Sequence, residues 1–330
     1  MRRLFGLLAS FGLFACGGLD QPPVTIEPPA GEDAQTAIVE AAGPDAGAMV
    51  TVDAALLTAP DAATPPATTV RVMTWNTENF FDDVDDPKRE DTVVTTEEMD
   101  AKTAALAKVI QAQDPDVVSL QEVENEMVLQ RLAAQTGLPF VALVPSYDFR
   151  GINVAVASRL PIARTVSHLG EKLYAPDGAG PYRWARDCLE VHLTAPDGRE
   201  LVLLVNHQTS QLDTAAGDVK RQAQANRARS IADSLRTDDP SRAVIIAGDL
   251  NDEPSASSIG LLVSDGQWID VATDVPDAER YTYVYNTPRR YDYLLPDAAT
   301  AAKRTSVTIV HGDEVEAASD HSPVVATFAW

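Results

Sequence analysis

The amino-acid sequence predicts a mixed α/β domain in which helices cover the outside of packed sheets. The chain has 330 residues, of which 45% are hydrophobic, so it can bury a full core. Short apolar runs rich in Val, Ile and Leu recur between polar or Gly/Pro breaks, as strands do. Helical patterns separate the early runs, whereas the late strands are paired, and this order favours the mixed class.

Residues 1–16 have the pattern of an export signal. Arg2 and Arg3 precede the apolar run LFGLLASFGLFA, which is too short to span a hydrocarbon core of roughly 30 Å, so no integral membrane domain is expected. The run ends in LFAC, which resembles a bacterial lipobox, where Cys16 would carry a lipid; an ordinary secretory signal is the alternative. A protein lipidated at Cys16 is expected in the cell envelope. Because Gly17 follows the cysteine, the outer membrane is the expected location in a Gram-negative cell.

Residues 17–69 are predicted to be a disordered acidic tether. They are rich in Ala, Pro and Thr and contain eight acidic residues but no Lys or Arg. Such a segment buries too little apolar surface to offset the entropy of ordering it. Subtracting the tether (-8) and the signal (+2) from the formal charge of -23 leaves -17 on residues 70–330. A domain this acidic does not attract polyanions in bulk, so phosphate chemistry would need bound cations.

Eight strands and three helices are expected in residues 70–330. The strands are expected at 70–75, 116–120, 153–158, 188–193, 201–205, 243–247, 291–295 and 324–328. The first helix begins at a capping box made by Thr95 and Glu98 and stops before Pro115. The second and third helices cover residues 124–136 and 218–236, where apolar residues recur at helical spacing.

Cys188 is the only cysteine besides Cys16, so a chain lipidated at Cys16 has no internal disulfide available. In the string RDCLEVHL, Leu189, Val191 and Leu193 alternate with the cysteine and two other polar residues. This alternation places the thiol on the more polar face of a strand. We expect an inert strand cysteine rather than a nucleophile.

Polar side chains stand in or beside six of the expected strands and loops. Asn76 and Glu78 follow the first strand in TWNTEN, and Glu122 follows the second in LQEVEN. The other candidates are His207 in VNHQTS, Asp249 and Asn251 in GDLN, Asp292 in RRYDYLL, and Asp320 and His321 in SDHSP. Each one taken singly is better explained as a turn or cap residue. Together they predict a site if the strands share one sheet edge.

Such a set of side chains suits attack of water on a phosphorus ester. Glu78, Glu122 and Asp320 offer hard oxygen ligands for Mg²⁺ or Mn²⁺, with Ca²⁺ as a further option. The few imidazoles and the absence of clustered thiolates in the sequence disfavour a structural zinc site. A bound cation would neutralise the phosphate and the developing charge on the leaving oxygen, while an imidazole and carboxamides would hold the other phosphoryl oxygens.

The ordered strings TWNTEN, LQEVEN, GDLN, YDYLL and SDHSP resemble the endonuclease/exonuclease/phosphatase (DNase I-like) superfamily of metal-dependent phosphodiesterases. The resemblance covers residues 70–330 and implies a DNase I-like four-layer α/β/β/α sandwich. The strings NFFDDVDDP, AKTAALAKVI, RGINVAVASR and RDCLEVHL are similar to a bacterial secreted nuclease-like branch. In that branch the histidine string more often reads NHLKSK, so Gln208 and Thr209 depart from it and remove a basic residue.

The resemblance implies a role for each acidic and amide residue of the metal side. Asn76 is similar to a carboxamide that positions the catalytic water or its aspartate. Glu122 is similar to the principal metal ligand. Glu78 and Asp320 match auxiliary metal contacts, which can act through water because Mg²⁺ keeps part of its hydration shell.

It also implies roles in proton transfer and phosphate binding. Asp249 is similar to the group that orients or deprotonates the attacking water, and Asn251 to a phosphate or water contact. His321 matches the histidine that supports the transition state, and Asp292 the carboxylate that fixes its tautomer. His207 matches a second histidine, which donates a hydrogen bond to the phosphate or a proton to the leaving group.

Arg150 and Arg186 match arginines that precede two strands in this branch, where they would contact the substrate phosphate; a structural ion pair is the alternative. Candidates for a local basic patch are Lys88, Arg89, Lys102, Arg150, Arg183, Arg186, Arg289 and Arg290. The remaining histidines match no catalytic string and are expected to be ordinary residues; they are His168, His192 and His311.

The leading hypothesis is an exported, lipid-tethered, divalent-metal phosphodiesterase that acts on DNA or RNA by in-line attack of water, without a covalent enzyme intermediate. The first alternative is a phosphatase or phosphodiesterase of small or lipid head-group esters, which needs no basic groove. The second alternative is a surface binding protein that kept the fold and lost catalysis. The sequence implies no protein partner, and we expect a monomer.

Overall fold

The structure is a computed structural model that describes residues 68–211 and 214–330. The expected export signal and nearly all of the expected tether lie outside the described residues. Within the described part of the chain, every helix is too short or too polar to cross a membrane.

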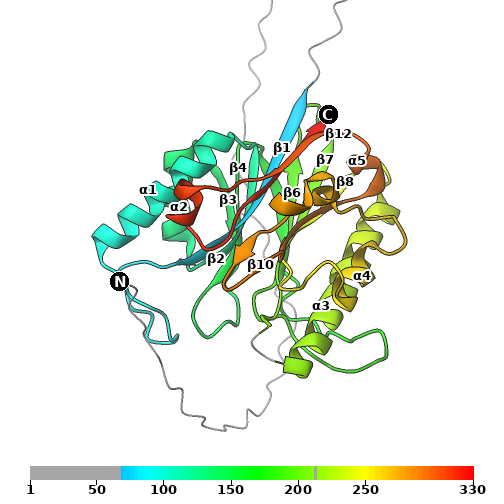
Figure 1. Cartoon of the computed structure of the whole chain (residues 1–330), viewed down its shortest axis with the longest axis horizontal. Coiled ribbons are helices and arrows are strands. Elements are labelled where there is room, and N and C mark those ends of the chain that lie inside the picture. Colours follow the sequence, from blue (N-terminus) through cyan, green and yellow to red (C-terminus); the bar gives the residue numbers. More distant parts are fainter. Residues whose placement is uncertain (1–67, 212–213) are drawn as a thin grey trace, which may run out of the picture. The chain divides into compact units, whose positions relative to one another are not determined.

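Two β-sheets lie face to face (Figure 1). The first has the strand order β12-β13-β1-β2-β4-β3 and consists of β1 (Thr69–Phe80), β2 (Val117–Val123), β3 (Phe140–Leu143), β4 (Asn153–Ser158), β12 (Arg304–Ile309) and β13 (Val324–Ala329). The second has the order β11-β8-β7-β6-β5 and consists of β5 (Ile162–Val166), β6 (Cys188–Thr194), β7 (Glu200–His207), β8 (Ala243–Asp249) and β11 (Asp292–Pro296). A small separate hairpin is formed by β9 (Tyr283–Val284) and β10 (Pro288–Arg289).

Helices cover the outer faces of both sheets, so the layer order is the expected α/β/β/α. The first sheet is covered by α1 (Thr96–Gln113) and α2 (Glu126–Thr136). The second is covered by α3 (Thr214–Asp238) and α4 (Ser257–Val263). Shorter turns are α5 (Ala298–Ala301), α6 (Asp313–Glu316) and the 3₁₀ segments Val271–Asp274 and Asp277–Glu279.

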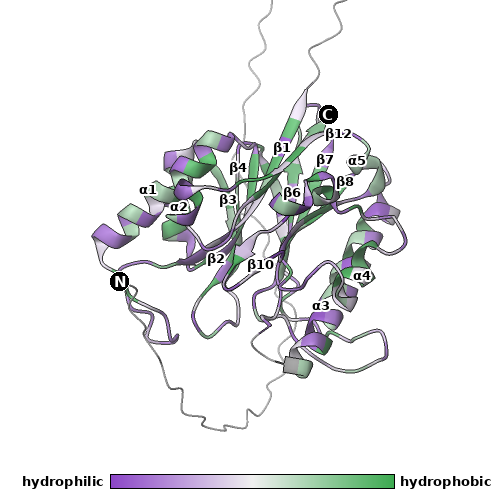
Figure 2. Ribbon diagram, in the orientation of Figure 1, coloured by the Kyte–Doolittle hydropathy of each residue, from purple (hydrophilic) through white to green (hydrophobic). Residues whose placement is uncertain are grey.

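Three apolar cores hold these layers together. The central core lies between the sheets and includes Val72, Leu203 and Phe328, all fully buried. The outer cores lie under α1 and α2 and under α3 and α4, and include Trp75 and Val244. Each fully buried side chain of this size contributes about 1.5–3 kcal/mol. Because both faces of the central strands are covered, strings such as LVLLV and AVIIA are continuously apolar (Figure 2).

All eight expected strands form, and the expected capping box is present at the start of α1. Thr95 Oγ1 accepts a hydrogen bond from the Glu98 backbone at 3.2 Å, and Glu98 accepts one from the Thr95 backbone at 2.9 Å. The unexpected strands include β5 and β12, at the sheet edges, and the hairpin β9–β10. Their residues are mostly exposed or half-buried, so sequences such as RTSVTI lack the long apolar run of a central strand.

Cys188 lies on the strand face of β6 that also carries Glu190 and His192, as the alternation predicted, and this face is buried. Cys188 is fully buried in the core between the second sheet and α3. The two faces of β6 do alternate, but α3 covers the face that carries this cysteine. Burial raises the pKa of the thiol, which keeps it protonated and unreactive.

Candidate active site

A cavity of about 730 Å³ opens at one edge of the sheet pair. Ten of the eleven sequence-predicted site residues in the described part of the chain line it. The eleventh, Asp292, is hydrogen-bonded to His321 and lies outside the lining. The remaining candidate, Cys16, lies outside the described residues. Segments that are far apart in the sequence therefore meet at a single cavity.

Irregular backbone aims the acidic side chains into the cavity. The sequence placed Asn76 and Glu78 after the end of the first strand, but β1 continues to Phe80 with a register shift between Asn76 and Phe80. A second shift in β2 brackets Glu122. Glu78 and Glu122 have φ values of 52° and 63°, in the left-handed region that non-glycine residues rarely adopt. Such bulges re-aim side chains beside active sites, and their strain must be offset by packing elsewhere.

The carboxamide of Asn76 links two carboxylates. Its Nδ2 donates to Asp249 Oδ2 at 3.0 Å and to Glu122 Oε1 at 3.4 Å. Its Oδ1 accepts from the Glu78 backbone N–H at 3.0 Å, so the amide orientation is fixed. The other oxygen of Asp249 accepts from the backbone N–H of Asn251 at 2.9 Å. Asp249 is buried, and burial together with the charge of Asp292 raises its pKa.

His321 is held by a buried carboxylate. Its Nδ1 lies 2.7 Å from Asp292 Oδ2, and its Nε2 points toward Asp249 and Asp320 at 4.0 and 3.9 Å. Burial disfavours the imidazolium, but the charge and hydrogen bond of Asp292, with the charges of Asp249 and Asp320, outweigh it and raise the pKa of His321 to about 10. These carboxylates therefore favour the imidazolium form of His321.

The backbone around His321 is tied to β1. Trp75 Nε1 donates to the His321 carbonyl at 2.8 Å. The Ser319 hydroxyl donates to the Asn76 carbonyl at 2.7 Å and accepts from the His321 N–H at 3.0 Å. The SDHSP segment is thus fixed against the strand that carries Asn76.

His207, the last residue of β7, has its pKa shifted in the opposite direction. Its Nε2 lies 3.5 Å from Asp249 Oδ2 and 3.8 Å from Glu122 Oε1. Burial, reinforced by the charges of Arg186, Arg150 and His321, holds its pKa well below the ordinary value. A neutral imidazole at this position can donate one hydrogen bond without adding charge.

Glu78, Glu122 and Asp320 form an acidic edge of the cavity. The Asp320 backbone N–H donates to Glu78 Oε2 at 3.0 Å, and Lys102 on α1 lies 4.0 Å from the same oxygen. Burial and the charges of Glu78 and Glu122 raise the pKa of Asp320 to about 6, despite the opposing charge of His321. Mutually repelling carboxylates without a thiolate are a donor set that fits a hard divalent cation.

A second set of ligand atoms also lies close together. One atom each from Asp249, Asp292 and His321 falls within 4.8 Å of the others. The 2.7 Å hydrogen bond between His321 and Asp292 already engages one nitrogen and one carboxylate of this set. The acidic edge is also partly engaged, since Glu122 accepts hydrogen bonds from Asn76 Nδ2 and from the Asn79 N–H at 3.0 Å. Both sets offer carboxylate oxygens to a hard cation.

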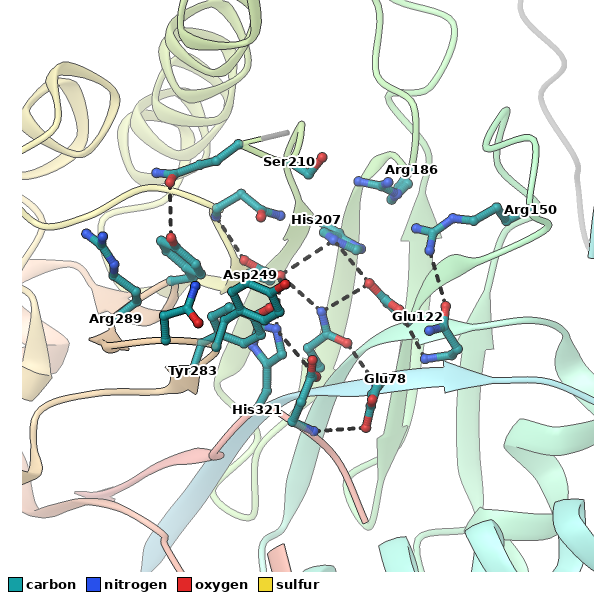
Figure 3. Close-up of a pocket in the computed structure, with 18 of the residues that line it drawn as sticks. Glu78, Glu122, Arg150, Arg186, His207, Ser210, Asp249, Tyr283, Arg289 and His321 are labelled. Atoms are coloured by element: carbon teal, nitrogen blue, oxygen red, sulfur yellow. Dashed lines mark hydrogen bonds and ion pairs between the residues drawn. The ribbon is translucent and has the colours of Figure 1, made fainter. Parts of the chain in front are cut away.

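Arg150 and Arg186 enter the cavity side by side because one buried carboxylate holds both (Figure 3). Asp148 Oδ2 accepts from Arg186 Nε at 2.8 Å, and Asp148 Oδ1 lies 3.6 Å from Arg150 Nε. Arg186 also donates to the Gln208 carbonyl at 3.1 Å, and Arg150 to Asn79 Oδ1 at 3.2 Å. The two expected roles, ion pair and phosphate contact, are compatible in this geometry.

A family model described as "Endonuclease/Exonuclease/phosphatase family" matches residues 73–321. The matched range includes all eleven site residues described above. This chain belongs to the Endonuclease/Exonuclease/phosphatase family. A search of curated proteins found no match.

Solved structures share the fold of this family member. An endonuclease/exonuclease/phosphatase from Beutenbergia cavernae has a TM-score of 0.59 and 21% identity, covering 79% of this chain and 71% of its own. The human Nocturnin catalytic domain with bound sulfate has a TM-score of 0.57 and 17% identity, and the match covers 79% of this chain and 94% of the Nocturnin chain. D. rerio TDP2 complexed with single strand DNA product has a TM-score of 0.55 and 17% identity, covering 79% and 99%. At these identities the likeness establishes the DNase I-like fold.

Two of the expected patch residues of this family member serve the fold instead. Arg290 is buried and pairs with Asp270. Arg89 donates to the carbonyls of Ser146 and Asp148, both at 2.8 Å. Arg289 does line the cavity, next to Glu253 at 2.8 Å.

Sequence reasoning missed the aromatic residues of the cavity, which are Phe149, Tyr283, Tyr285 and Tyr291. Tyr283 packs on His321 with ring centroids 4.8 Å apart. The alternating tyrosines of YTYVYNTPRRYDYLL were the available signal. Tyr283 and Tyr285 belong to none of the predicted site strings, and Tyr291, next to Asp292, resembles a core residue in a strand, so only the structure assigns these tyrosines to the site.

Proposed function

We propose that this family member is an exported, divalent-metal-dependent phosphodiesterase that hydrolyses DNA or RNA by in-line attack of water. One observation carries the proposal: the Asn76 amide joins Asp249 to Glu122, while Asp292 holds His321 beside them in the same cavity. A carboxylate that can accept a proton and an imidazolium that can bind an anion thus face one reaction space.

Asp249 is suited to accept the proton of the attacking water. Burial and the charge of Asp292 raise its pKa, so this pKa is closer to neutral pH than that of an ordinary aspartate. Asn76 and the backbone N–H of Asn251 each fix one of its oxygens. The proton therefore moves to a carboxylate of defined orientation.

The two histidines are suited to hold phosphoryl oxygens. His321 presents Nε2 as a charged donor because Asp292 engages Nδ1. His207 presents a neutral ring beside it, and its low pKa makes it a poor cation. Preorganised donors of this kind stabilise the negative charge that develops in the transition state.

Glu122, Glu78 and Asp320 would hold the divalent cation on the acidic edge. When bound, the cation supplies charge neutralisation for the phosphate and the leaving oxygen. Arg150 and Arg186, which lie on the same side of the cavity as Glu122, would orient the same phosphate, since a guanidinium matches phosphate geometry. D. rerio TDP2, which shares the fold, is complexed with a single strand DNA product, and this supports a nucleic acid as the substrate class.

Hydrolysis of bis(4-nitrophenyl) phosphate with Mg²⁺ or Mn²⁺ tests the proposal. We expect Asp249→Ala and His321→Ala each to lower kcat by at least about 10²-fold. Chelation by EDTA should remove activity and added Mg²⁺ should restore it. His311→Ala is the matched control, because His311 stacks on Tyr281 outside the cavity. Activity near wild type in either site variant, or full activity in EDTA, would contradict the proposal.

The acidic surface favours a second candidate, a hydrolase of small or lipid head-group phosphate esters. The formal charge of residues 70–330 is -17, and Arg89 and Arg290 are engaged in structural contacts. A panel of plasmid DNA, RNA, sphingomyelin and inositol phosphates, each with Mg²⁺, Mn²⁺ or Ca²⁺, separates the candidates. Turnover of the small esters alone would favour the second candidate, and turnover of none would favour a binding protein.

Export and lipidation are separate parts of the proposal and rest on the pattern of residues 1–16. We expect radiolabelled palmitate to label the wild-type protein in the bacterial membrane fraction and Cys16→Ser to lose the label. Cys188→Ser is the control. Cys188 is buried, so this variant should still be labelled at Cys16. Equal labelling of wild type and Cys16→Ser would exclude lipidation at this residue.

A further inference from the structure

Two strongly exposed aromatic side chains line the cavity. Phe149 is 61% exposed and Tyr285 is 78% exposed. Large aromatic side chains that line a polar cavity in this way gain little from the folded domain itself, because they leave most of their surface in water. Their position therefore points to a ligand that covers them.

The two aromatics belong to different walls of the cavity. Phe149 directly precedes Arg150 in the connection between β3 and β4, and Tyr285 belongs to the turn of the β9–β10 hairpin. Figure 3 shows Arg150 and Arg186 to one side of the acidic centre, with Tyr283 and Arg289 on the other. Each wall thus combines an exposed aromatic side chain with an arginine.

Both walls have an anchored backbone. On the Phe149 wall, the Phe149 carbonyl accepts from the Glu90 N–H at 2.7 Å, and Asp148 binds the Arg150 N–H at 2.9 Å. On the hairpin wall, Tyr283 pairs with Arg289 across the two strands. The rings are exposed on fixed backbone, which lowers the entropy cost of binding a ligand.

We propose that Phe149 and Tyr285 stack unpaired bases on the two sides of the scissile phosphate, so that the substrate is single-stranded nucleic acid cleaved internally. The inference rests on the proposed phosphodiesterase function. Stacking accepts every base, because each base has a π face, and it needs no basic groove. It therefore supplies affinity in a domain whose charge of -17 opposes binding of polyanions.

The geometry favours single strands over duplexes. In a duplex the base faces are already stacked within the helix, so they are not available to protruding side chains. Unpaired bases on both sides of the phosphate can contact the two walls at once. Two platforms flanking the reaction centre also imply nucleotides on both sides of the broken bond, which is internal cleavage rather than removal of a terminal nucleotide.

The test compares a single-stranded DNA 12-mer with a chain of the same length in which tetrahydrofuran spacers replace all the bases. Both have the same phosphates and charge, so only the bases differ. We expect Phe149→Ala and Tyr285→Ala each to lower kcat/KM on the 12-mer about tenfold, mainly through KM. On the spacer chain the same variants should lower kcat/KM by less than about twofold. Phe149→Tyr and Tyr285→Trp should restore cleavage of the 12-mer, which excludes a folding defect as the cause.

Tyr174→Ala is the matched control, because Tyr174 is 46% exposed and lies outside the cavity lining; it should match wild type on both chains. Circular single-stranded DNA should be linearised, and duplex DNA of the same sequence should be cleaved more slowly. Three results would overturn the inference: equal losses of kcat/KM on both chains, no loss on either chain, or faster cleavage of the duplex. In each case, continued hydrolysis of bis(4-nitrophenyl) phosphate would leave the proposed function standing. If the wild type does not hydrolyse that diester or the 12-mer, the proposed function itself fails.

Discussion

His207 and His321 are both buried side chains that line the same cavity, yet their neighbours shift their pKa values in opposite directions. Asp292 binds His321 directly and stabilises the imidazolium, whereas His207 lies near the arginines and is neutral. The side-chain type is the same in both cases. The position of one carboxylate therefore decides which histidine can carry a positive charge toward a phosphate.

Replacing Asp292 by Asn tests this assignment at the level of one residue. Asp292→Asn keeps the shape of the side chain but removes the charge that stabilises the His321 imidazolium. We expect the pKa of His321 to fall and kcat for bis(4-nitrophenyl) phosphate to drop by about 10²-fold or more, with a smaller change in KM. Histidine NMR titration and steady-state kinetics measure the two effects.

Asp297→Asn is a matched control for that variant. Asp297 follows the other end of β11, is equally buried, and caps α5 away from the cavity. Asn is also a good N-cap residue, so kcat should stay near wild type. An unchanged His321 pKa in Asp292→Asn would refute the assignment.

At the scale of elements, the parallel strands β7 and β8 place His207 opposite Asp249. The preceding pair is Asn206 and Gly248. Gly248 has a φ of 127°, and a Cβ built on it would lie 2.0 Å from the Asn206 carbonyl oxygen. The glycine in GDLN therefore permits the close approach of two strands that both end in the cavity.

Gly248→Ala should destabilise the domain by about 2–4 kcal/mol, because the clash involves backbone rather than a mobile side chain. Gly260→Ala in α4 is the control, since its Cβ would meet no atom within 4 Å. That change should be neutral or stabilise the protein by up to about 1 kcal/mol. Urea denaturation measures both, and similar midpoints for the two variants would count against the close-approach explanation.

At the scale of the whole described domain, a chain of charges connects α3 to the second sheet. Basic and acidic side chains alternate along it in the order Arg227, Glu171, His168, Glu190, His192, Glu200 and Arg242. His168 lies 3.0 Å from Glu171 and 3.1 Å from Glu190. As the sequence led us to expect, neither His168 nor His192 lines the cavity. Their role is to connect layers.

This chain of charges predicts a pH-dependent stability. Burial disfavours a charged His168, but hydrogen bonds to Glu171 and Glu190 outweigh it and raise its pKa from 6.5 to about 9. The raised pKa means that its contribution is fully present below pH 6.5 and is lost as pH rises through about 9. For Glu190, burial is outweighed by His168 and His192, which lower its pKa to about 2, so its contribution is lost as pH falls from 4.5 through about 2.

The variant His168→Gln tests the predicted loss of stability at alkaline pH. The wild-type protein should exceed this variant in unfolding free energy by up to about 3 kcal/mol near pH 6, and the difference should shrink toward pH 9. Urea unfolding at a series of pH values measures it. A difference that stays constant from pH 6 to pH 10 would contradict the prediction.

The sequence predicted the strands that are buried on both faces of their sheet. Strands such as Ala243–Asp249 are continuously apolar, and the capping box at Thr95 is local in sequence, so both were recognised. Edge strands such as Arg304–Ile309 and the short hairpin that carries Tyr285 have no such pattern, because half of their surface faces water. The bulge at Glu122 was also missed, since a register shift depends on the partner strand.

The sequence by itself determined which acids, amides and imidazoles end the buried strands, because apolar runs and the polar residues that follow them are local features. Only the tertiary structure decided their charge states and their partners. Asn76 and Asp249 are 173 positions apart, yet their side chains meet at 3.0 Å. A pKa depends on burial and on nearby charges, and both are set by segments that are distant along the chain.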